Sequence, residues 1–154
     1  MRIVSIDPGL RNMGFAIIND GVLVDFGSIC IWDLVPKNKH SDYPFIARVL
    51  VDNTDIFTDV DIVLIERQMQ SRMKMIACSL RCFFWEKSHM VAPLSVRKYF
   101  NISTGVYKNN KKASIELVPK YLSIAQIDKF KQSKKKDDMA DSILQGLYWC
   151  KIKK

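Results

Sequence analysis

The chain has 154 residues, a length typical of one domain with its own hydrophobic core. Its 24 lysine and arginine residues against 16 acidic ones leave a formal net charge of +8, which favours a polyanionic partner over a solvated basic surface that binds nothing. It contains no apolar run near the roughly 18 residues that cross a bilayer, no secretory signal and no CxxC spacing, so we expect an intracellular, non-membrane protein whose four cysteines hold neither zinc nor disulfides.

The first third of the chain predicts an antiparallel meander of three strands. An apolar strand over residues 3–6 ends at Asp7, and a Pro-Gly turn leads to a second strand over residues 14–18. An Asp-Gly pair then separates two apolar runs, which is a strong hairpin signal. The third strand is expected over residues 22–32, with Gly27 as a candidate bulge.

The middle of the chain changes from helical to strand patterns and back. A turn-rich loop over residues 36–43 precedes a helix expected over residues 44–56. The continuous apolar run of residues 60–66 reads as a strand buried on both faces, and it ends at Glu66. Apolar residues then recur every three or four positions over residues 69–85, which predicts an amphipathic helix.

The last third predicts mostly helices joined by polar loops. The expected elements are a strand over residues 89–92, a short helix over 95–100, a loop over 101–110, a helix over 111–117 that Pro119 stops or kinks, a basic loop over 129–136 and a helix over 136–150. Since no linker or internal repeat interrupts this order, residues 1–154 are expected to form one domain.

Four acidic residues stand out by their positions. Asp7 and Glu66 end apolar strands, while Asp138 and Asp141 lie three residues apart near the start of the last helix. Acids at a helix start often only complement the helix dipole. If the two strands pair, however, four carboxylates converge and repel one another unless cations neutralise them. Mg²⁺ or Mn²⁺ suits such oxygen ligands, and two ions can clamp an in-line phosphoryl displacement, so the sequence predicts a metal-dependent nuclease.

The order of elements, with acids after the first and fourth strands and on the last helix, resembles the RNase H-like fold of the RuvC-type Holliday junction resolvases. The resemblance is carried by Ile-Asp-Pro-Gly-Leu-Arg-Asn-Met-Gly at 6–14, Leu-Ile-Glu-Arg-Gln at 64–68 and Asp-Met-Ala-Asp-Ser at 138–142, and its framework spans the whole chain. It implies an α/β fold with a mixed five-stranded sheet, three antiparallel strands followed by two parallel ones, flanked by helices. Glu66-Arg67-Gln68 followed by Arg72 looks more like the poxviral and mitochondrial branches, and the small size points to the poxviral one. A viral origin would place the protein at cytoplasmic sites of viral DNA replication.

The resemblance also implies a site and a substrate. The catalytic metal ligands would be Asp7, Glu66, Asp138 and Asp141, holding two Mg²⁺ ions for which Mn²⁺ substitutes. The family's catalytic lysine follows a Thr-Gly loop, here Thr104-Gly105, and fits Lys112, with Lys108 and Lys111 as alternatives. DNA-binding residues are expected to be Arg11, Arg67, Gln68, Arg72, Lys108, Lys111, Lys134, Lys135 and Lys136.

The expected partner is four-way junction and related branched DNA, resolved by paired symmetric nicks without a nucleotide cofactor. A closed two-fold dimer presents one active site to each of two strands, so a homodimer is expected. Its candidate interface is the apolar stripe of the helix over residues 69–85, namely Met73, Ile76, Ala77, Leu80 and Phe84, although core packing also explains such a stripe.

Three rival functions remain open at this point. The Asp-Pro-Gly loop also resembles the first phosphate loop of actin-like kinases, but those enclose a nucleotide between two domains and this chain has the length of one. An RNase H-like nuclease acting on structured RNA would share the acids. A non-catalytic branched-DNA-binding protein would lose affinity by keeping four carboxylates near phosphates.

Overall fold

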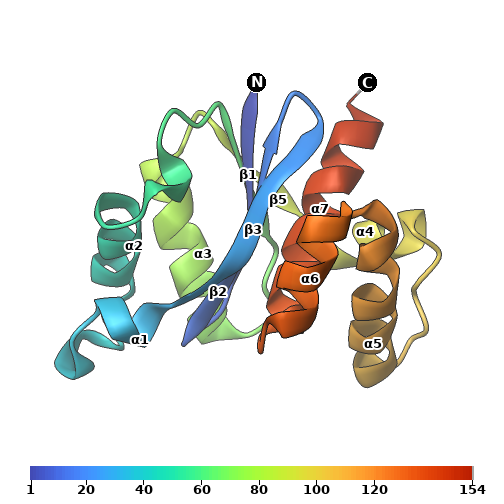
Figure 1. Ribbon diagram of the computed structural model, residues 1–154. Helices are drawn as coiled ribbons and strands as arrows, with labels where there is room; N and C mark the ends of the chain where they lie inside the picture. The colour runs from blue at the N-terminus through green and yellow to red at the C-terminus, as the bar shows by residue number, and fades with distance from the viewer. Residues whose placement is uncertain (154) are drawn as a thin grey trace.

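The computed structural model describes residues 1–153 and is built around one five-stranded sheet of order β3-β2-β1-β4-β5 (Figure 1). The strands β1 (Arg2–Pro8), β2 (Asn12–Asn19) and β3 (Val22–Cys30) form an antiparallel meander. The strands β4 (Ile62–Glu66) and β5 (Ser88–Val91) then add in parallel to β1. This is the mixed sheet that the sequence predicts, with β1 in its centre.

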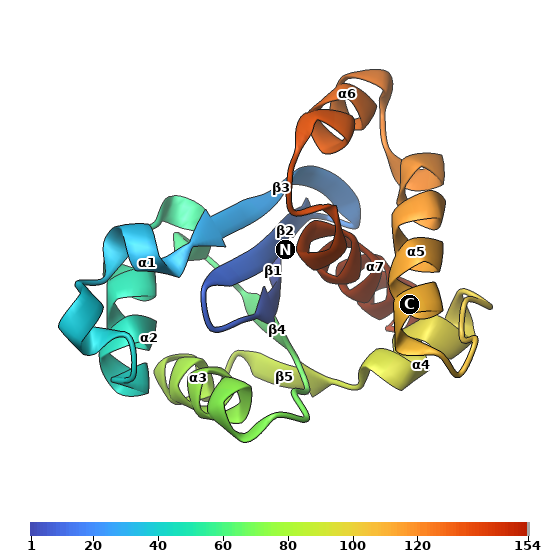
Figure 2. The ribbon, with the colours of Figure 1, turned by 90° about the horizontal axis from the view of Figure 1, so that it is seen from below.

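Helices cover both faces of the sheet (Figures 1 and 2). On one side lie α1 (Ile31–Leu34), α2 (Tyr43–Asp52) and α3 (Ser71–Phe83). On the other lie α4 (Pro93–Tyr99), α5 (Tyr107–Leu117), α6 (Ile124–Gln132) and α7 (Lys136–Ile152). Short 3₁₀ turns, η1 (Lys37–Lys39), η2 (Asp55–Phe57) and η3 (Val118–Tyr121), join them.

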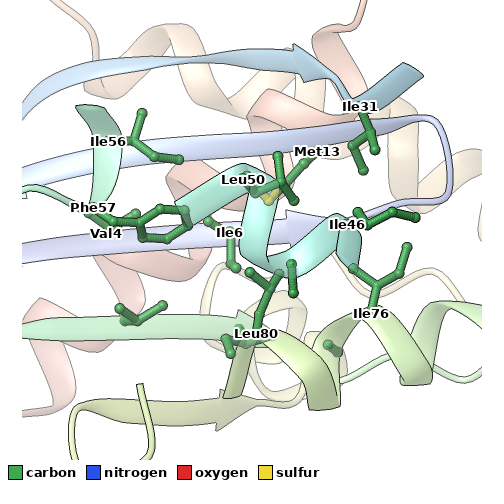
Figure 3. Close-up of a cluster of buried hydrophobic side chains, with 14 of the residues drawn as sticks. Val4, Ile6, Met13, Ile31, Ile46, Leu50, Ile56, Phe57, Ile76 and Leu80 are labelled. Atoms are coloured by element: carbon green, nitrogen blue, oxygen red, sulfur yellow. The ribbon is translucent and has the colours of Figure 1, made fainter. Parts of the chain in front are cut away.

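The alternation of side chains along β1 sends them into two separate cores. Val4 and Ile6 pack against α2 and α3, in the cluster shown in Figure 3, whereas Ile3 packs against α7. All three side chains are fully buried, as are those of Val63 and Leu64 in the neighbouring strand. A strand with apolar contacts on both faces has no polar side, which explains the continuous apolar runs of β1 and β4.

Two glycines allow α7 to lie directly against the sheet. A Cβ atom at Gly14 would stand 2.2 Å from the backbone carbonyl oxygen of Asp138, and one at Gly146 would stand 2.5 Å from the Cδ1 atom of Ile18. These separations are shorter than any van der Waals contact, so residues with side chains at these positions would push α7 away. The close approach brings the first turns of α7 against β2 and β1.

Several element boundaries differ from the sequence predictions. The helix predicted over residues 44–56 ends at Asp52, because the side chains of Asn53 and Thr54 donate to the carbonyl oxygens of Val49 and Leu50 and so compete with the backbone. The third strand stops at Cys30, two residues early, where α1 begins.

The bulge expected at Gly27 is wrong, and two of the predicted loops are shorter than expected. Gly27 pairs regularly with Phe15, and the register of the hairpin shifts instead between Ile17 and Ile18. The loop predicted over residues 101–110 ends early because α5 begins at Tyr107. The basic loop predicted over residues 129–136 is largely helical, since α6 begins at a capping box and runs to Gln132.

Candidate active site

The strand pairing brings the first two predicted acids together. Asp7 lies near the carboxyl end of β1 and Glu66 is the last residue of β4, and the two strands are parallel neighbours in which Ile6 pairs with Ile65. Carboxyl ends of parallel strands meet at one edge of a sheet, where α/β proteins place their binding sites. Figure 2 is a view onto this end of the sheet.

The third acid of the cluster comes from α7. Carboxylate oxygens of Asp7, Glu66 and Asp141 all lie within 4.8 Å of one another, a spacing at which one cation can contact all three. Asp138, one turn earlier on α7, is outside this triad but lines the same cavity of about 320 Å³. The predicted convergence of the acids is therefore present, with three at the centre and Asp138 beside them.

The close packing of these carboxylates disfavours their ionised forms. Burial, together with the charges of Asp141 and Asp138, raises the pKa of Asp7 to about 7. Burial and the charge of Asp7 hold the pKa of Glu66 well above its ordinary range. Burial, with the charge of Asp137, raises the pKa of Asp138 to about 6, and burial also raises the pKa of Asp141. A divalent cation would remove this repulsion.

The donor set fits a hard divalent cation. The three clustered residues offer only carboxylate oxygens, and neither cysteine nor histidine lines the cavity. Oxygen ligands of this kind suit Mg²⁺ and Mn²⁺, whereas zinc sites usually include sulfur or nitrogen. Asp7, Glu66 and Asp141 are the residues that would hold the ion.

Gln68 lies inside the acidic cluster, which differs from its expected place on a DNA-binding surface. Its side chain is 7% exposed, and its Nε2 amide donates to Oδ1 of Asp7 at 2.9 Å and to Oε1 of Glu66 at 3.3 Å. Each of these hydrogen bonds favours the charged form of its acceptor. Gln68 therefore links the two strand-end carboxylates and fixes their orientation.

The lysine that lines the cavity with the acids is Lys111, one of the two alternatives to Lys112 for the family's catalytic lysine. Lys111 lines the cavity, and its ammonium donates to Asp137 at 2.7 Å. Burial lowers the pKa of Lys111, but the hydrogen bonds and charge interactions with Asp137 and Tyr107 together outweigh it and leave the pKa raised, so this lysine is charged. Lys112 points to solvent, where it forms an exposed pair with Glu116, 3.7 Å away. The two residues differ by one position, which on a helix is a rotation of about 100°.

Two cavity residues were not identified from the sequence. Arg97 from α4 and Tyr107 from the start of α5 both line the cavity beside the acids. The positive charge of Arg97 opposes the burial effect on the pKa values of Glu66 and Asp141. No spacing in the sequence points to Arg97, because α4 reaches the site only through the parallel β4–β5 pairing that precedes it.

The remaining predicted DNA-binding residues are solvent-accessible and come from several separate segments of the chain. Arg67 lines the cavity. Arg11 lies over the ring of Trp32, 4.9 Å from its centroid, and Arg72 donates to the hydroxyl of Tyr43 at 2.9 Å. The rest of the set, all solvent-accessible, comprises Lys108, Lys134, Lys135 and Lys136.

The apolar stripe of α3 belongs to the core of the molecule. Ile76, Ala77 and Leu80 are at most 1% exposed and pack against the sheet, and Phe84 packs partly against the same cluster. Ile76, Ala77 and Leu80 therefore cannot form the dimer interface expected of them, and Met73, the first residue of the predicted stripe, is half-buried and lines the acidic cavity. The apolar side chains of this segment that remain exposed include Met75, Phe83 and Trp85.

No helix within residues 1–153 is both long enough and apolar enough to cross a membrane.

Comparisons with known proteins agree with this architecture. A family model described as Poxvirus A22 protein matches residues 1–154. Among solved structures, the fowlpox virus resolvase in complex with substrate Holliday junction DNA is 25% identical, with a TM-score of 0.70 and coverage of 99% of this chain and 98% of that chain. No curated protein matches the chain by sequence.

Two more distant structures show the same fold. The yeast mitochondrial Holliday junction resolvase Ydc2 is 18% identical, with a TM-score of 0.69 over 97% of this chain and 78% of that one. RuvC of Thermus thermophilus, in complex with a Holliday junction substrate, is 15% identical, with a TM-score of 0.60 over 96% and 91% of the two chains. The predicted RNase H-like fold of the RuvC type is confirmed.

Proposed function

This chain belongs to the poxvirus A22 protein family, and we propose that it is a Holliday junction resolvase, an endonuclease that cuts four-way and related branched DNA by paired, symmetric nicks. The observation that carries the proposal is the triad of Asp7, Glu66 and Asp141, clustered within 4.8 Å in a fold shared over nearly its full length with a junction-bound resolvase. All of residues 1–154 would act as one nuclease domain, at cytoplasmic sites of viral DNA replication.

The triad would hold Mg²⁺, and Asp138 beside it would help to hold a second ion. Bound Mg²⁺ supplies two kinds of chemistry here: it makes a water molecule nucleophilic and stabilises the departing 3′ oxygen. The protein's own contribution is to hold the carboxylates in place. The amide of Gln68 fixes Asp7 and Glu66, and the packing of α7 at Gly14 sets the position of the two aspartates.

Basic residues around the cavity would bind the phosphate backbone. Lys111 and Arg97 line the cavity beside the acids, so they are placed to neutralise a scissile phosphate and the charge that develops in the transition state. Asp137 keeps Lys111 oriented through its hydrogen bond of 2.7 Å. The exposed cations farther away, among them Arg72 and Lys135, would hold the duplex arms through salt-dependent contacts.

We also propose that two copies act together. A four-way junction has approximate two-fold symmetry, and paired nicks in strands of like polarity require two active sites related in the same way. With the stripe of Ile76, Ala77 and Leu80 in the core, the exposed apolar side chains at and after the end of α3, Phe83 and Trp85, are candidates for such a contact. A mass in solution of twice 17.8 kDa is expected.

A synthetic junction assay tests the proposal. Purified protein is incubated with Mg²⁺ and a four-way DNA junction, a matched linear duplex or a structured RNA, and the cuts are mapped on each strand. We expect two symmetric nicks in the junction, little cleavage of the linear duplex, and no cleavage after chelation of the metal. Preferential cleavage of RNA would favour the RNase H-like alternative, and binding without cleavage in Mg²⁺ or Mn²⁺ would favour a non-catalytic junction-binding protein.

The four acids provide the matched variants for that assay. Substitution of Asp7, Glu66, Asp138 or Asp141 by its amide should abolish cleavage and leave junction binding largely intact, because the acids hold the metal while the basic residues supply the affinity. A variant that cuts at a near-normal rate would remove that acid from the proposed site.

A further inference from the structure

One glutamine is buried where α7 packs against the sheet. Gln145 lies four residues after Asp141 and seven after Asp138, so it shares a face of α7 with both. Its side chain is 2% exposed, and its neighbours in the chain, Ile143 and Leu144, are equally buried in the apolar core. A polar side chain in this place requires a reason.

The amide of Gln145 joins three elements. Its Nε2 atom lies 3.0 Å from Oγ of Ser5, 3.2 Å from the carbonyl oxygen of Ile6 and 3.3 Å from the carbonyl oxygen of Leu64. Ile6 immediately precedes Asp7 in β1, and Leu64 stands two residues before Glu66 in β4. A single side chain on the helix that carries Asp141 thus contacts the backbone of both strands that carry the other two acids.

The same side chain also lies directly behind the carboxylates. Gln145 lines a cavity of about 10 Å³ together with Glu66, Asp141 and Ser114. A shift of α7 along or away from β1 and β4 would therefore stretch the contacts of Gln145 and change the separation between the carboxylate of Asp141 and those on the strands.

The hydrogen bonds that this amide donates contribute to stability, but its oxygen offsets that contribution. Among residues 1–153, Oε1 of Gln145 has no hydrogen-bond partner, and burying an unpaired oxygen costs about 1–3 kcal/mol. A methionine has nearly the same length and no polar atom to satisfy. Local departures of this kind from the rules of core packing are concentrated at functional sites.

We propose that Gln145 is a positioning residue for the metal-binding acids: it fixes α7 against β1 and β4 so that Asp7, Glu66 and Asp141 stand at the spacing one divalent cation requires. The proposal rests on the metal-dependent function proposed above. Residues that contact the metal ligands, and not the metal itself, commonly contribute 10- to 100-fold to metal affinity. Gln145 acts through the backbone of the strands, so the lower end of that range, about tenfold, is expected for it.

The test compares Gln145→Met with Gln132→Met, a substitution at the exposed end of α6, and with the unsubstituted protein. Binding of Mn²⁺ is measured by the decrease of the electron paramagnetic resonance signal of the free ion. Stability is measured by chemical denaturation in the presence of chelator. The affinity for a four-way junction is measured in the absence of metal. We expect Gln145→Met to bind Mn²⁺ about tenfold more weakly and to require correspondingly more Mg²⁺ for half-maximal cleavage. Its junction affinity without metal and its unfolding midpoint should match those of the Gln132→Met control.

A second variant controls for the hydroxyl of Ser5, which loses its hydrogen-bond donor when Gln145 is replaced. Gln145→Met leaves Oγ of Ser5 without its donor, so Ser5→Ala combined with Gln145→Met removes both polar groups. This double variant should fold as stably as the unsubstituted protein and show the same weakened Mn²⁺ binding.

Loss of cooperative folding in both variants would overturn the inference, because stability would then explain the glutamine. Unchanged Mn²⁺ affinity in a folded variant would also overturn it, while leaving the proposed function intact. Failure of the unsubstituted protein to bind Mn²⁺ or cut junctions would instead refute the proposed function, and the inference with it.

Discussion

Replacing Asp7 by asparagine should abolish cleavage and at the same time stabilise the metal-free protein. The substitution removes one negative charge from the triad with Glu66 and Asp141 and keeps an oxygen that accepts the hydrogen bond from Gln68. Most substitutions at partly buried sites destabilise a protein, so a gain in stability would be a specific sign that burial and the neighbouring carboxylates disfavour the ionised form of Asp7.

The size and pH range of the effect follow from the pKa of Asp7, which burial and the neighbouring acids raise from 3.8 to about 7. For an acid whose pKa is higher in the folded state, the unfolded chain loses its proton first, so folding stability falls as pH rises from about 4 to about 7. At 1.36 kcal/mol per pKa unit the full loss is at most about 4 kcal/mol, and solvent access through the cavity reduces it to about 2–4 kcal/mol.

The assay is denaturant unfolding in chelator at pH 4 and pH 8, with the exposed Asp33→Asn as a control. We expect Asp7→Asn to be more stable than the unsubstituted protein by about 2–4 kcal/mol at pH 8 and nearly equal to it near pH 4, which corresponds to a rise of about 5–15 °C in Tm at the higher pH. Added Mg²⁺ should stabilise the unsubstituted protein more than the variant. A variant that is less stable at pH 8, or an unsubstituted protein whose stability does not fall over this range, would refute the crowding of ionised carboxylates.

Three further experiments test other parts of the site and the pairing of two sites. Gly14→Ala should destabilise the fold by about 1–3 kcal/mol in denaturant unfolding and slow cleavage, because the added Cβ would stand 2.2 Å from the carbonyl oxygen of Asp138; a stable, fully active variant would show that α7 does not need this contact. Lys111→Gln should slow single-turnover cleavage by about 10²-fold or more, while Lys112→Gln should change it little, and the opposite ranking would mean that Lys112 serves the site. In a mixed dimer, one subunit carrying Asp7→Asn should leave a junction nicked once, as seen on denaturing and native gels, and complete resolution by that dimer would contradict the paired-site mechanism.

Local patterns were sufficient to predict the strands and the acids, and the resemblance to the RuvC-type resolvases supplied the order of the sheet. Asp7 and Glu66 follow apolar runs that only a strand buried on both faces produces, and Asp138 and Asp141 have the spacing of one helix face. Parallel pairing of β1 with β4 then follows from the fold, and the carboxylates meet because of it. Element boundaries were less accurate where side chains such as Thr54 compete with the backbone, since that competition depends on geometry rather than on residue type.

The tertiary structure decided which of several equivalent residues serve the site. Helical periodicity identifies the stripe of Ile76 and Leu80 but not what covers it, and the sheet of the same molecule covers it here. Lys111 and Lys112 are alike in sequence, and only the start of α5 at Tyr107 and the packing of that helix beside α7 turn the first toward the acids and the second toward solvent.

The partners of the buried amides also come from remote parts of the chain. Gln68 meets Asp7 across 61 positions, and Gln145 meets Ser5 across 140. The sequence by itself determined the strands, the helices and the carboxylates, because each is encoded by neighbouring residues. The contacts that hold those carboxylates at metal-binding distance were decided only when the chain folded, because each of them joins residues that no local pattern relates.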